Sequence, residues 1–235
     1  MLELYSEQTK CLVALDSIIF GFDGSKLKLL LVKRGIEESK DIWSLMGGWL
    51  QPKEGLDQAA NRILENLTGL QNIYLEQLST FGLPDRDPVE RTVSVTYFAL
   101  INVDDYEQFS ANSQKAKWFD FDDLPELLFD HGQMVDNAIQ RLRNKAAFHP
   151  LGFELLPEKF TLPQLQALYE AIFNMAFDKR NFSRKILSSG LLTKLDEKQK
   201  GFSKKGAYLY KLNSQTSEKA ASSNLYFVPS IDSLV

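Results

Sequence analysis

The first third of the chain alternates long apolar runs with short turn signals. Residues 11–22 and 27–32 are mostly apolar, and the pair Asp23-Gly24 falls between them. An Asp-Gly pair between two apolar runs is typical of a two-stranded hairpin. The pattern therefore predicts a hairpin that enters a buried sheet.

Two later stretches have the composition of strands, and a third has that of a helix. Residues 91–103 are rich in β-branched and aromatic side chains and predict a central strand, while residues 115–125 predict a short strand that ends in a turn. From Leu124 to Lys145, apolar side chains recur at helical spacing. Together these elements predict an α+β sandwich. The apolar positions of the predicted helix are Met134, Ala138, Ile139 and Leu142.

The pattern changes after residues 146–164, which three prolines interrupt. Thr161 is predicted to cap a helix with Pro163 in its first turn. Asp178 is predicted to cap a second, basic helix that Gly190 ends. Two short strands around a Lys- and Gly-containing loop follow, so the order is that of a winged helix. The inward positions are Leu165, Leu168, Ile172 and Met175 in the first helix and Phe182, Ile186 and Leu187 in the second.

Composition describes a globular protein that is neither exported nor embedded in a membrane. Of 235 residues, 44% are hydrophobic and 25% charged. The single Cys11 excludes an internal disulfide, and two scattered histidines form no zinc-like cluster. The N-terminus is acidic where a signal peptide is basic, and no apolar run reaches the roughly 20 residues of a membrane span. We expect a cytoplasmic protein.

The net charge of −4 is unevenly distributed. Residues 1–145 carry a net charge of −8, whereas residues 146–235 carry +4. Within residues 175–211, ten basic side chains accompany three acidic ones. Such an excess creates a positive field suited to a polyanion, although a charge run is also common on a solvated surface.

Residues 48–70, GWLQPKEGLDQAANRILENLTGL, form a motif of fixed spacing. It resembles the Nudix box, which runs Gly, five residues, Glu, seven residues, Arg-Glu, an aliphatic residue, any residue, Glu-Glu, any residue, Gly and an aliphatic residue. The resemblance implies a Nudix-like α/β/α sandwich with a mixed sheet. The residues that stand at their places in the pattern are Gly48, Glu54, Arg62, Leu64, Gly69 and Leu70.

The three box glutamates that hold Mg²⁺ in the hydrolases are absent from their positions. Ile63, Asn66 and Leu67 stand there instead, and Ile and Leu supply none of the hard oxygen ligands that Mg²⁺ needs. Glu65 is rotated away from that face by the helical turn of about 100° per residue, and Glu54 alone is a poor metal site. We therefore expect no catalytic residue, no metal and no cofactor.

A degenerate Nudix-like domain joined to a basic winged helix resembles the Nudix-related transcriptional regulators. Beyond the box, the resemblance rests on residues 129–172 and 178–192. It implies a homodimeric repressor that binds palindromic double-stranded operator DNA and is released by a small effector. Branches of that family sense ADP-ribose or L-arabinose. Because the domain is acidic and lacks the metal ligands that a diphosphate prefers, L-arabinose and a role in sugar catabolism are the first choice, and ADP-ribose is the alternative.

Candidate binding residues follow from the chemistry of each ligand. Sugar sites combine aromatic faces with carboxylate, amide and basic groups, although tryptophans also pack in cores and residues 85–88 also suit a plain turn. Arg and Asn make bidentate base contacts, and wing lysines meet phosphates. The effector candidates are Trp43, Trp49, Gln51, Lys53, Glu54, Asp85, Arg86 and Glu90. The DNA-binding candidates are Lys179, Arg180, Asn181, Ser183, Arg184, Lys185, Lys198, Lys200, Lys204 and Lys205.

These features divide the chain into four segments and leave two alternatives open. One alternative is a nucleoside diphosphate hydrolase with an atypical metal site at Glu54 and Glu90. The other is an interaction scaffold whose basic hairpin meets an acidic partner or RNA. His131 and His149 are interpreted as structural or exposed residues. The segments are a Nudix-like effector-sensing domain (1–147), a linker (148–157), a winged helix-turn-helix domain (158–213) and a C-terminal tail (214–235).

Overall fold

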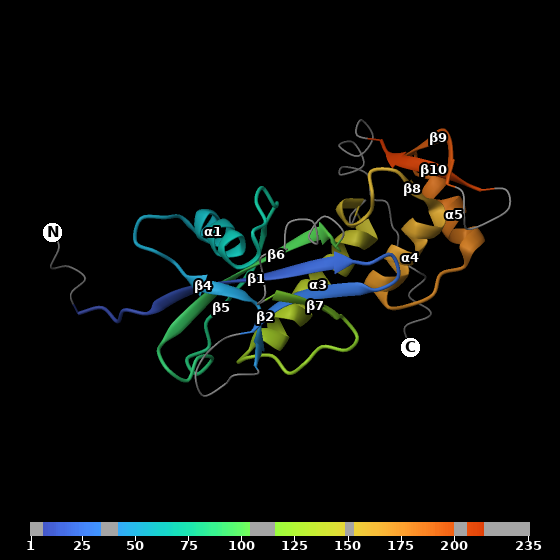
Figure 1. Ribbon diagram of the computed structural model, residues 1–235. Coiled ribbons are helices and arrows are strands. Elements are labelled where there is room, and N and C mark those ends of the chain that lie inside the picture. Colours follow the sequence, from blue (N-terminus) through green and yellow to red (C-terminus); the bar gives the residue numbers. More distant parts are fainter. Residues whose placement is uncertain (1–6, 34–41, 104–115, 149–152, 200–205, 214–235) are drawn as a thin grey trace.

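The computed structural model describes residues 7–33, 42–103, 116–148, 153–199 and 206–213, which form two parts (Figure 1). The first part is a seven-stranded mixed sheet with a helix on each face, and the second holds two helices and a three-stranded sheet. This arrangement confirms the predicted α+β class, with a Nudix-like sandwich followed by a winged helix.

The large sheet is organised around two long buried strands. β1 (Leu12–Phe22) pairs in parallel with β6 (Thr92–Asn102) along its whole length. The predicted hairpin joins β1 to β2 (Leu27–Lys33), and its turn has a left-handed Gly24 with a φ of 92°. The strand order is β3-β2-β1-β6-β5, with β4 on β1 and β7 on β2. The remaining strands are β3 (Trp43–Ser44), β4 (Met46–Trp49), β5 (Glu76–Phe81) and β7 (Ala116–Asp120).

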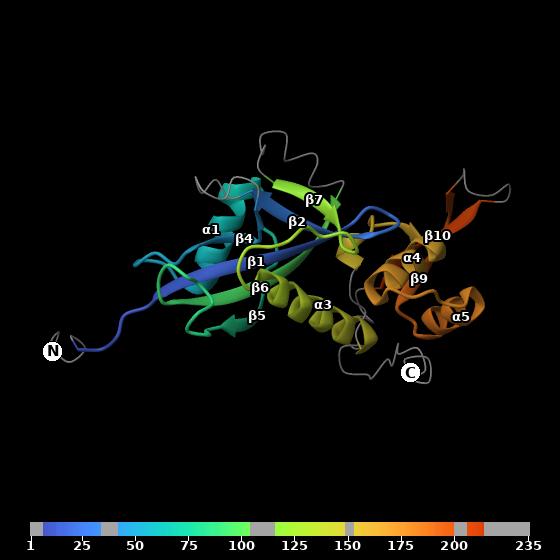
Figure 2. The same cartoon turned by 90° about the horizontal axis from the view of Figure 1, so that it is seen from below.

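One helix covers each face of the large sheet (Figure 2). α1 (Leu56–Thr68) lies on the face to which Leu15 and Ile19 of β1 point. α3 (His131–Phe148) covers the other face, where Ile18 is buried. Successive residues of a strand point to opposite faces, so β1 is mostly apolar, with Asp16 and Ser17 as exceptions, because both of its faces are covered.

The second part has the element order predicted for a winged helix. α4 (Leu162–Phe173) begins at the predicted cap, where Gln164 N–H donates to Thr161 Oγ1 at 3.3 Å and Thr161 N–H donates to Gln164 Oε1 at 2.8 Å. Asp178 caps the first turn of α5 (Lys179–Ser188) through a 2.8 Å hydrogen bond. The other elements are the 3-10 helix η3 (Phe153–Leu155) and a sheet of order β8-β10-β9, with β8 (Phe160–Thr161), β9 (Leu192–Gln199) and β10 (Ala207–Leu212).

A continuous apolar cluster joins the two parts. Buried side chains of α3, such as Leu142, belong to the same cluster as Leu165 and Leu168 of α4 and Ile186 of α5. The segment expected as a linker contributes Leu155 and Leu156, which are both buried. The winged helix is therefore packed against the Nudix-like part.

The helix expected from Leu124 starts later than the apolar spacing indicates. α3 begins at His131. Pro125 restricts the residue before it to extended conformations, and Phe129 has a left-handed φ of 51°. Both features interrupt a helix, so the segment from Leu124 to Asp130 forms a loop that leads into α3.

Two side chains also differ from their expected positions. Met175 lies beyond α4, which ends where Asn174 turns left-handed with a φ of 51°. Leu187 is 47% exposed, because Phe182 and Ile186 already fill the inward face of the short helix α5.

No helix in the described ranges is long and apolar enough to cross a membrane.

Candidate functional site

One arginine holds the loop of the Nudix-like motif in place. Arg62 Nε donates to Glu54 Oε2 at 2.8 Å, and Arg62 Nη2 donates to Glu54 Oε1 at 2.5 Å and to the Trp49 carbonyl at 2.9 Å. The Gln51 backbone N–H donates to Glu54 Oε1 at 2.8 Å. Bonding to Arg62 lowers the pKa of Glu54, and bonding to Glu54 raises the pKa of Arg62. Glu54 therefore shapes the loop with both of its oxygens engaged.

The first missing box glutamate is replaced by a core side chain. Ile63 is 4% exposed, and a Cβ added at Gly48 would lie 2.9 Å from Ile63 Cδ1. Glycine at position 48 thus suits the close approach of β4 to α1, since a larger residue would displace the Ile63 side chain. Leu67 is half-buried on the same face, and Asn66 is exposed. This face of α1 packs against the sheet through apolar groups.

No group of three or more His, Cys, Asp or Glu side chains in the described part of the chain could hold a metal ion. Glu65 is exposed and accepts a hydrogen bond from Gln71 Nε2 at 2.5 Å, so it does not replace a box glutamate. Glu90, the alternative partner of Glu54 in a metal site, is exposed on the loop before β6, which consists of residues 82–91 between β5 and β6.

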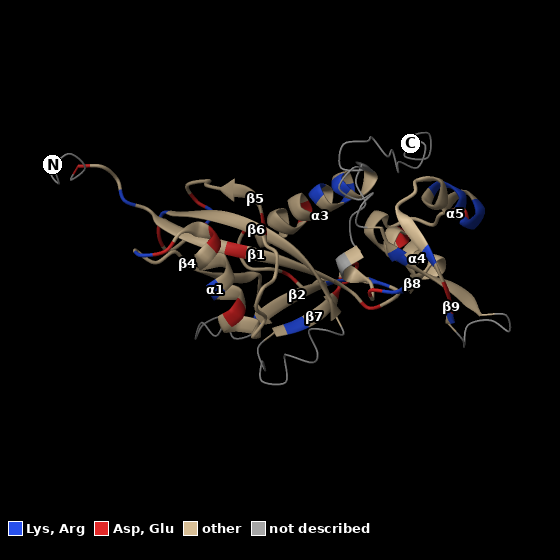
Figure 3. Cartoon of the chain, turned by 90° about the horizontal axis from the view of Figure 1, so that it is seen from above, with Lys and Arg blue, Asp and Glu red and all other residues tan. Residues whose placement is uncertain are grey.

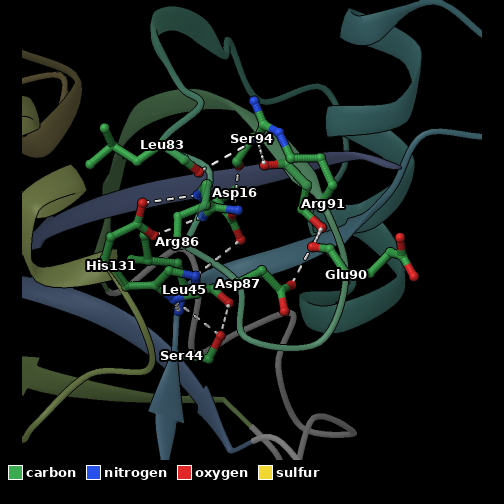
Figure 4. A network of polar contacts seen from close by, with 12 residues as sticks. Asp16, Ser44, Leu45, Leu83, Arg86, Asp87, Glu90, Arg91, Ser94 and His131 are labelled. Carbon is green, nitrogen blue, oxygen red and sulfur yellow. Dashed lines mark hydrogen bonds and ion pairs between the residues drawn. The ribbon is translucent and has the colours of Figure 1, made fainter. Parts of the chain in front are cut away.

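A buried polar network lies on the opposite face of the sheet, at the start of α3 (Figure 4). Asp16 is 4% exposed within β1, and its Oδ2 accepts a 2.6 Å hydrogen bond from Ser94 Oγ. Its Oδ1 lies 3.7 Å from His131 Nε2. The Leu45 backbone N–H donates to His131 Nδ1 at 3.2 Å, so a neutral imidazole carries its proton on Nε2, toward Asp16.

The sequence alone does not reveal this network. His131 is indeed buried, but it has a carboxylate neighbour in Asp16 that the sequence does not place near it. The available signal was the aspartate inside the apolar run LVALDSIIF, because a buried carboxylate requires a partner.

An ion pair fixes the loop before β6 against the start of α3. Arg86 Nε and Nη2 donate to the two carboxylate oxygens of Asp130 at 2.9 and 2.7 Å. The two side chains are only 3% and 12% exposed, so the pair is nearly desolvated and depends on its bidentate geometry. Arg91 braces the same loop by donating to the Gly82 carbonyl at 3.0 Å. The loop therefore carries two arginines that are held by this network (Figure 4).

The eight predicted effector residues fall into two groups. Glu54 and Arg86 are engaged in the ion pairs described above, and Trp43 is half-buried with its ring edge-on to Phe119 at 4.7 Å. The exposed candidates lie at the end of β4, on the Nudix-like loop that follows it and on the loop before β6. They are Trp49, Gln51, Lys53, Asp85 and Glu90.

Lys and Arg residues occupy much of helix α5 (Figure 3), and these side chains are exposed. Phe182 and Ile186 are buried and hold the helix to α4, whereas Ser183 is half-buried. Arg184 Nη2 donates to Asn181 Oδ1 at 2.9 Å, which aligns two side chains able to contact bases. The exposed candidates on this helix are Lys179, Arg180, Asn181, Arg184 and Lys185.

The wing, formed by β9 and β10, carries an aromatic ring next to two lysines. Lys194 Nζ and Lys198 Nζ lie 3.6 and 4.4 Å from the centre of the Tyr208 ring. Lys198 is one of the predicted DNA-binding residues, and the pairing of β9 with β10 places Tyr208 beside it, an arrangement that the sequence does not show. The predicted residues Lys200, Lys204 and Lys205 lie outside the described residues.

A Nudix fold followed by a winged helix with an exposed basic helix defines a DNA-binding regulator with a ligand domain. The family model of the NUDIX domain matches residues 12–138, and that of the NrtR DNA-binding winged helix domain matches residues 152–212. The chain is 35% identical over 210 residues to the ADPR responsive transcriptional repressor NtrR of Acinetobacter baylyi, covering 88% of this chain and 84% of that protein. The chain therefore belongs to the NrtR family of Nudix-related transcriptional regulators.

Solved structures support the same assignment. The chain is 31% identical to Shewanella oneidensis NrtR complexed with a 27mer DNA, with a TM-score of 0.76 over 88% of this chain and 95% of that chain. It is 32% identical to the NUDIX domain of the same Shewanella protein complexed with ADP ribose, with a TM-score of 0.51 over 60% of this chain and 96% of that chain.

Proposed function

We propose that this protein is a transcriptional repressor that leaves its operator when ADP-ribose binds to the Nudix-like domain. The proposal is carried by the Nudix-like loop, which the Arg62–Glu54 pair holds in shape. In the helix that follows, the buried Ile63 stands at a position where the hydrolases have a metal-binding glutamate. A retained loop without metal ligands suits binding better than hydrolysis. The exposed basic helix α5 provides the DNA-binding surface.

The relatives favour the ADP-ribose alternative over the first choice of L-arabinose. One relative is named as an ADPR responsive repressor, and a related NUDIX domain is complexed with ADP ribose. The preference for a sugar relied on the net acidity of the whole domain. Net charge does not show where a single cation lies, and the exposed Lys53 on the Nudix-like loop can meet a diphosphate.

On the DNA side, we propose that α5 enters the major groove of a palindromic operator and that the protein binds as a homodimer. Arg180, Asn181 and Arg184 are exposed on the outward face and match the residue types that read bases. Lys198 on the wing is suited to a phosphate contact.

Operator binding with and without effector tests this function. In fluorescence anisotropy titrations with the operator beside its own gene, ADP-ribose is expected to weaken binding about tenfold, a typical allosteric coupling. L-arabinose is the matched control and should leave the affinity unchanged. An arabinose response without an ADP-ribose response would contradict the choice of effector, and no response to either would contradict the sensor role.

The absence of hydrolysis is tested separately. Incubation with ADP-ribose and Mg²⁺ should release no AMP or ribose 5-phosphate. Mg²⁺-dependent release that is lost in Glu54→Gln would instead support the alternative of an enzyme with an atypical site.

A further inference from the structure

Helix α3 connects the buried network of the Nudix-like part to the winged helix. At its start, Asp130 holds Arg86 through two hydrogen bonds and His131 lies beside Asp16. The loop that carries Arg86 also carries two effector candidates, Asp85 and Glu90. A shift of this loop would therefore pull directly on the first turn of α3.

The other end of α3 is bound to the winged helix by a specific polar contact. Arg143 Nε donates to the Ile172 carbonyl at 2.8 Å. Ile172 lies in the last turn of α4, where carbonyls lack partners within the helix and the helix dipole favours a cation. Burial lowers the pKa of Arg143, and the Asp122 carboxylate opposes this shift. If its acceptor moves away, a half-buried guanidinium loses more free energy than an exposed one, because water replaces the lost hydrogen bond less easily.

Beyond this contact, α4 determines where α5 begins. Glu170 Oε1 accepts the Phe177 backbone N–H at 2.8 Å, and Gln166 Nε2 donates to the Phe177 carbonyl at 2.9 Å. The turn before α5 is thus bound to α4 at both polar groups of one residue. A displacement of α4 would carry the basic helix with it.

A pocket that is open to solvent lies between the two parts, and Ala171, which precedes Ile172 in α4, is part of its lining. It has a volume of about 450 Å³ and lies between the turn that joins β1 to β2 and the end of α4. Its walls include Lys26 and Phe121 on one side and Ala171 and Met175 on the other. Because packed interfaces resist movement, this space leaves room for α4 to move while α3 keeps its hold on the sheet.

We propose that α3 couples the two parts, with the Arg86–Asp130 pair as its contact at the effector end and Arg143 as the positioning residue that holds α4. The link between effector binding and release from the operator rests on the proposed function. The positioning of α4 by Arg143 does not depend on it. From Asp130 to Arg143 the helix spans about 20 Å at 1.5 Å per residue, so a rigid tilt at one end is carried to the other.

The positioning role is tested without any effector by measuring the distance between the two parts. With Cys11→Ser removing the native thiol, Asn61→Cys on α1 and Ser188→Cys on α5 accept spin labels at exposed sites, and dilution with unlabelled chain suppresses distances between copies. Arg143→Gln should at least double the width of the distance distribution. Arg141→Gln removes the same charge from an exposed position of the same helix and should leave the width unchanged. An unchanged width in Arg143→Gln would overturn the role of Arg143.

The coupling role is tested by the ratio of operator dissociation constants with and without ADP-ribose. This ratio should fall from about tenfold to below threefold in Arg143→Gln, be partly restored in Arg143→Lys, and stay unchanged in Arg141→Gln. Calorimetry should give the same ADP-ribose affinity, within twofold, for all four proteins. A full ratio in Arg143→Gln would overturn the coupling. A wild-type protein without any ADP-ribose response would instead refute the proposed function, and the label distances would still decide on Arg143.

A double variant tests whether both contacts act through one helix. Asp130→Asn keeps a hydrogen-bond acceptor for Arg86 but removes the charge. If both contacts act through α3, the double variant Asp130→Asn/Arg143→Gln should lower the ratio of operator dissociation constants no further than the single variant with the larger effect. Losses that add in full would show independent routes and overturn the proposal.

Discussion

Arginines in the Nudix-like motif and on helix α5 are used in different ways. Arg62 donates to Glu54 and to the Trp49 carbonyl, so its hydrogen bonds are made within the chain. Arg180 on α5 is exposed on a helix whose buried side chains are apolar. A motif residue that is bonded internally maintains a shape, whereas an exposed one can meet a partner. The comparison explains how one chain keeps the outline of a hydrolase motif while its contact with a macromolecule lies elsewhere.

The largest effect is expected from restoring a box glutamate in the Nudix-like motif. Ile63→Glu would place a carboxylate at a 4% exposed position beneath Gly48, and we expect a loss of about 3 kcal/mol of unfolding free energy from burying an unpaired charge. Urea denaturation with and without Mg²⁺ measures it.

The matched control for that change is the exposed Asn66→Glu, which should alter stability by less than about 0.5 kcal/mol. If Mg²⁺ restored the stability of Ile63→Glu, the loop would still be a metal frame, and the interpretation of Glu54 as a purely structural residue would be wrong.

The next largest effect is expected on α5. Arg180→Ala and Arg184→Ala should each cost about 1–3 kcal/mol of operator binding and relax sequence preference at one position, because each removes a potential bidentate contact to a base. Binding to a panel of single-base operator variants measures both effects. Unchanged preference in both variants would contradict the placement of this helix in the major groove.

The elements that sequence predicted well are those with local signals. Thr161 and Asp178 cap their helices as expected, and the hairpin at Asp23-Gly24 forms, because caps and turns depend on residues a few positions apart. The predicted start of α3 was wrong, because the apolar spacing begins at Leu124, whereas the helical backbone begins only at His131, after Pro125.

The candidate site was predicted only where a motif fixes spacing. The spacing of the box placed Glu54 and Arg62 correctly relative to each other, and they are paired. No local pattern links Arg86 with Asp130, because these residues meet only after the sheet brings the loop before β6 beside α3. The preference for L-arabinose rested on the net charge of the domain, whereas the relatives named for ADP-ribose favour the alternative.

A smaller effect is expected on the wing. Lys198→Ala should weaken binding evenly across operator sequences and reduce the slope of log affinity against log salt concentration by about 1, because one phosphate contact is lost. Titrations at several salt concentrations measure the slope. Lys159→Ala is a suitable control, because Lys159 is paired with Glu197 at 2.8 Å. A change in sequence preference in Lys198→Ala would indicate a base contact instead.

The smallest effect concerns the pH dependence of the Nudix-like loop. Bonding to Arg62 places the folded pKa of Glu54 below its ordinary value of 4.5. The pair therefore stabilises the folded protein fully above about pH 4.5 and loses its contribution as the pH falls through the lower folded pKa. Thermal unfolding between pH 3 and 7 should show a shallower acid decline in Glu54→Gln than in the wild type, because the glutamine has no proton to bind. An identical decline in both proteins would mean that the Glu54–Arg62 pair adds no net stability, and the contrast with the exposed arginines of α5 would then rest on geometry alone.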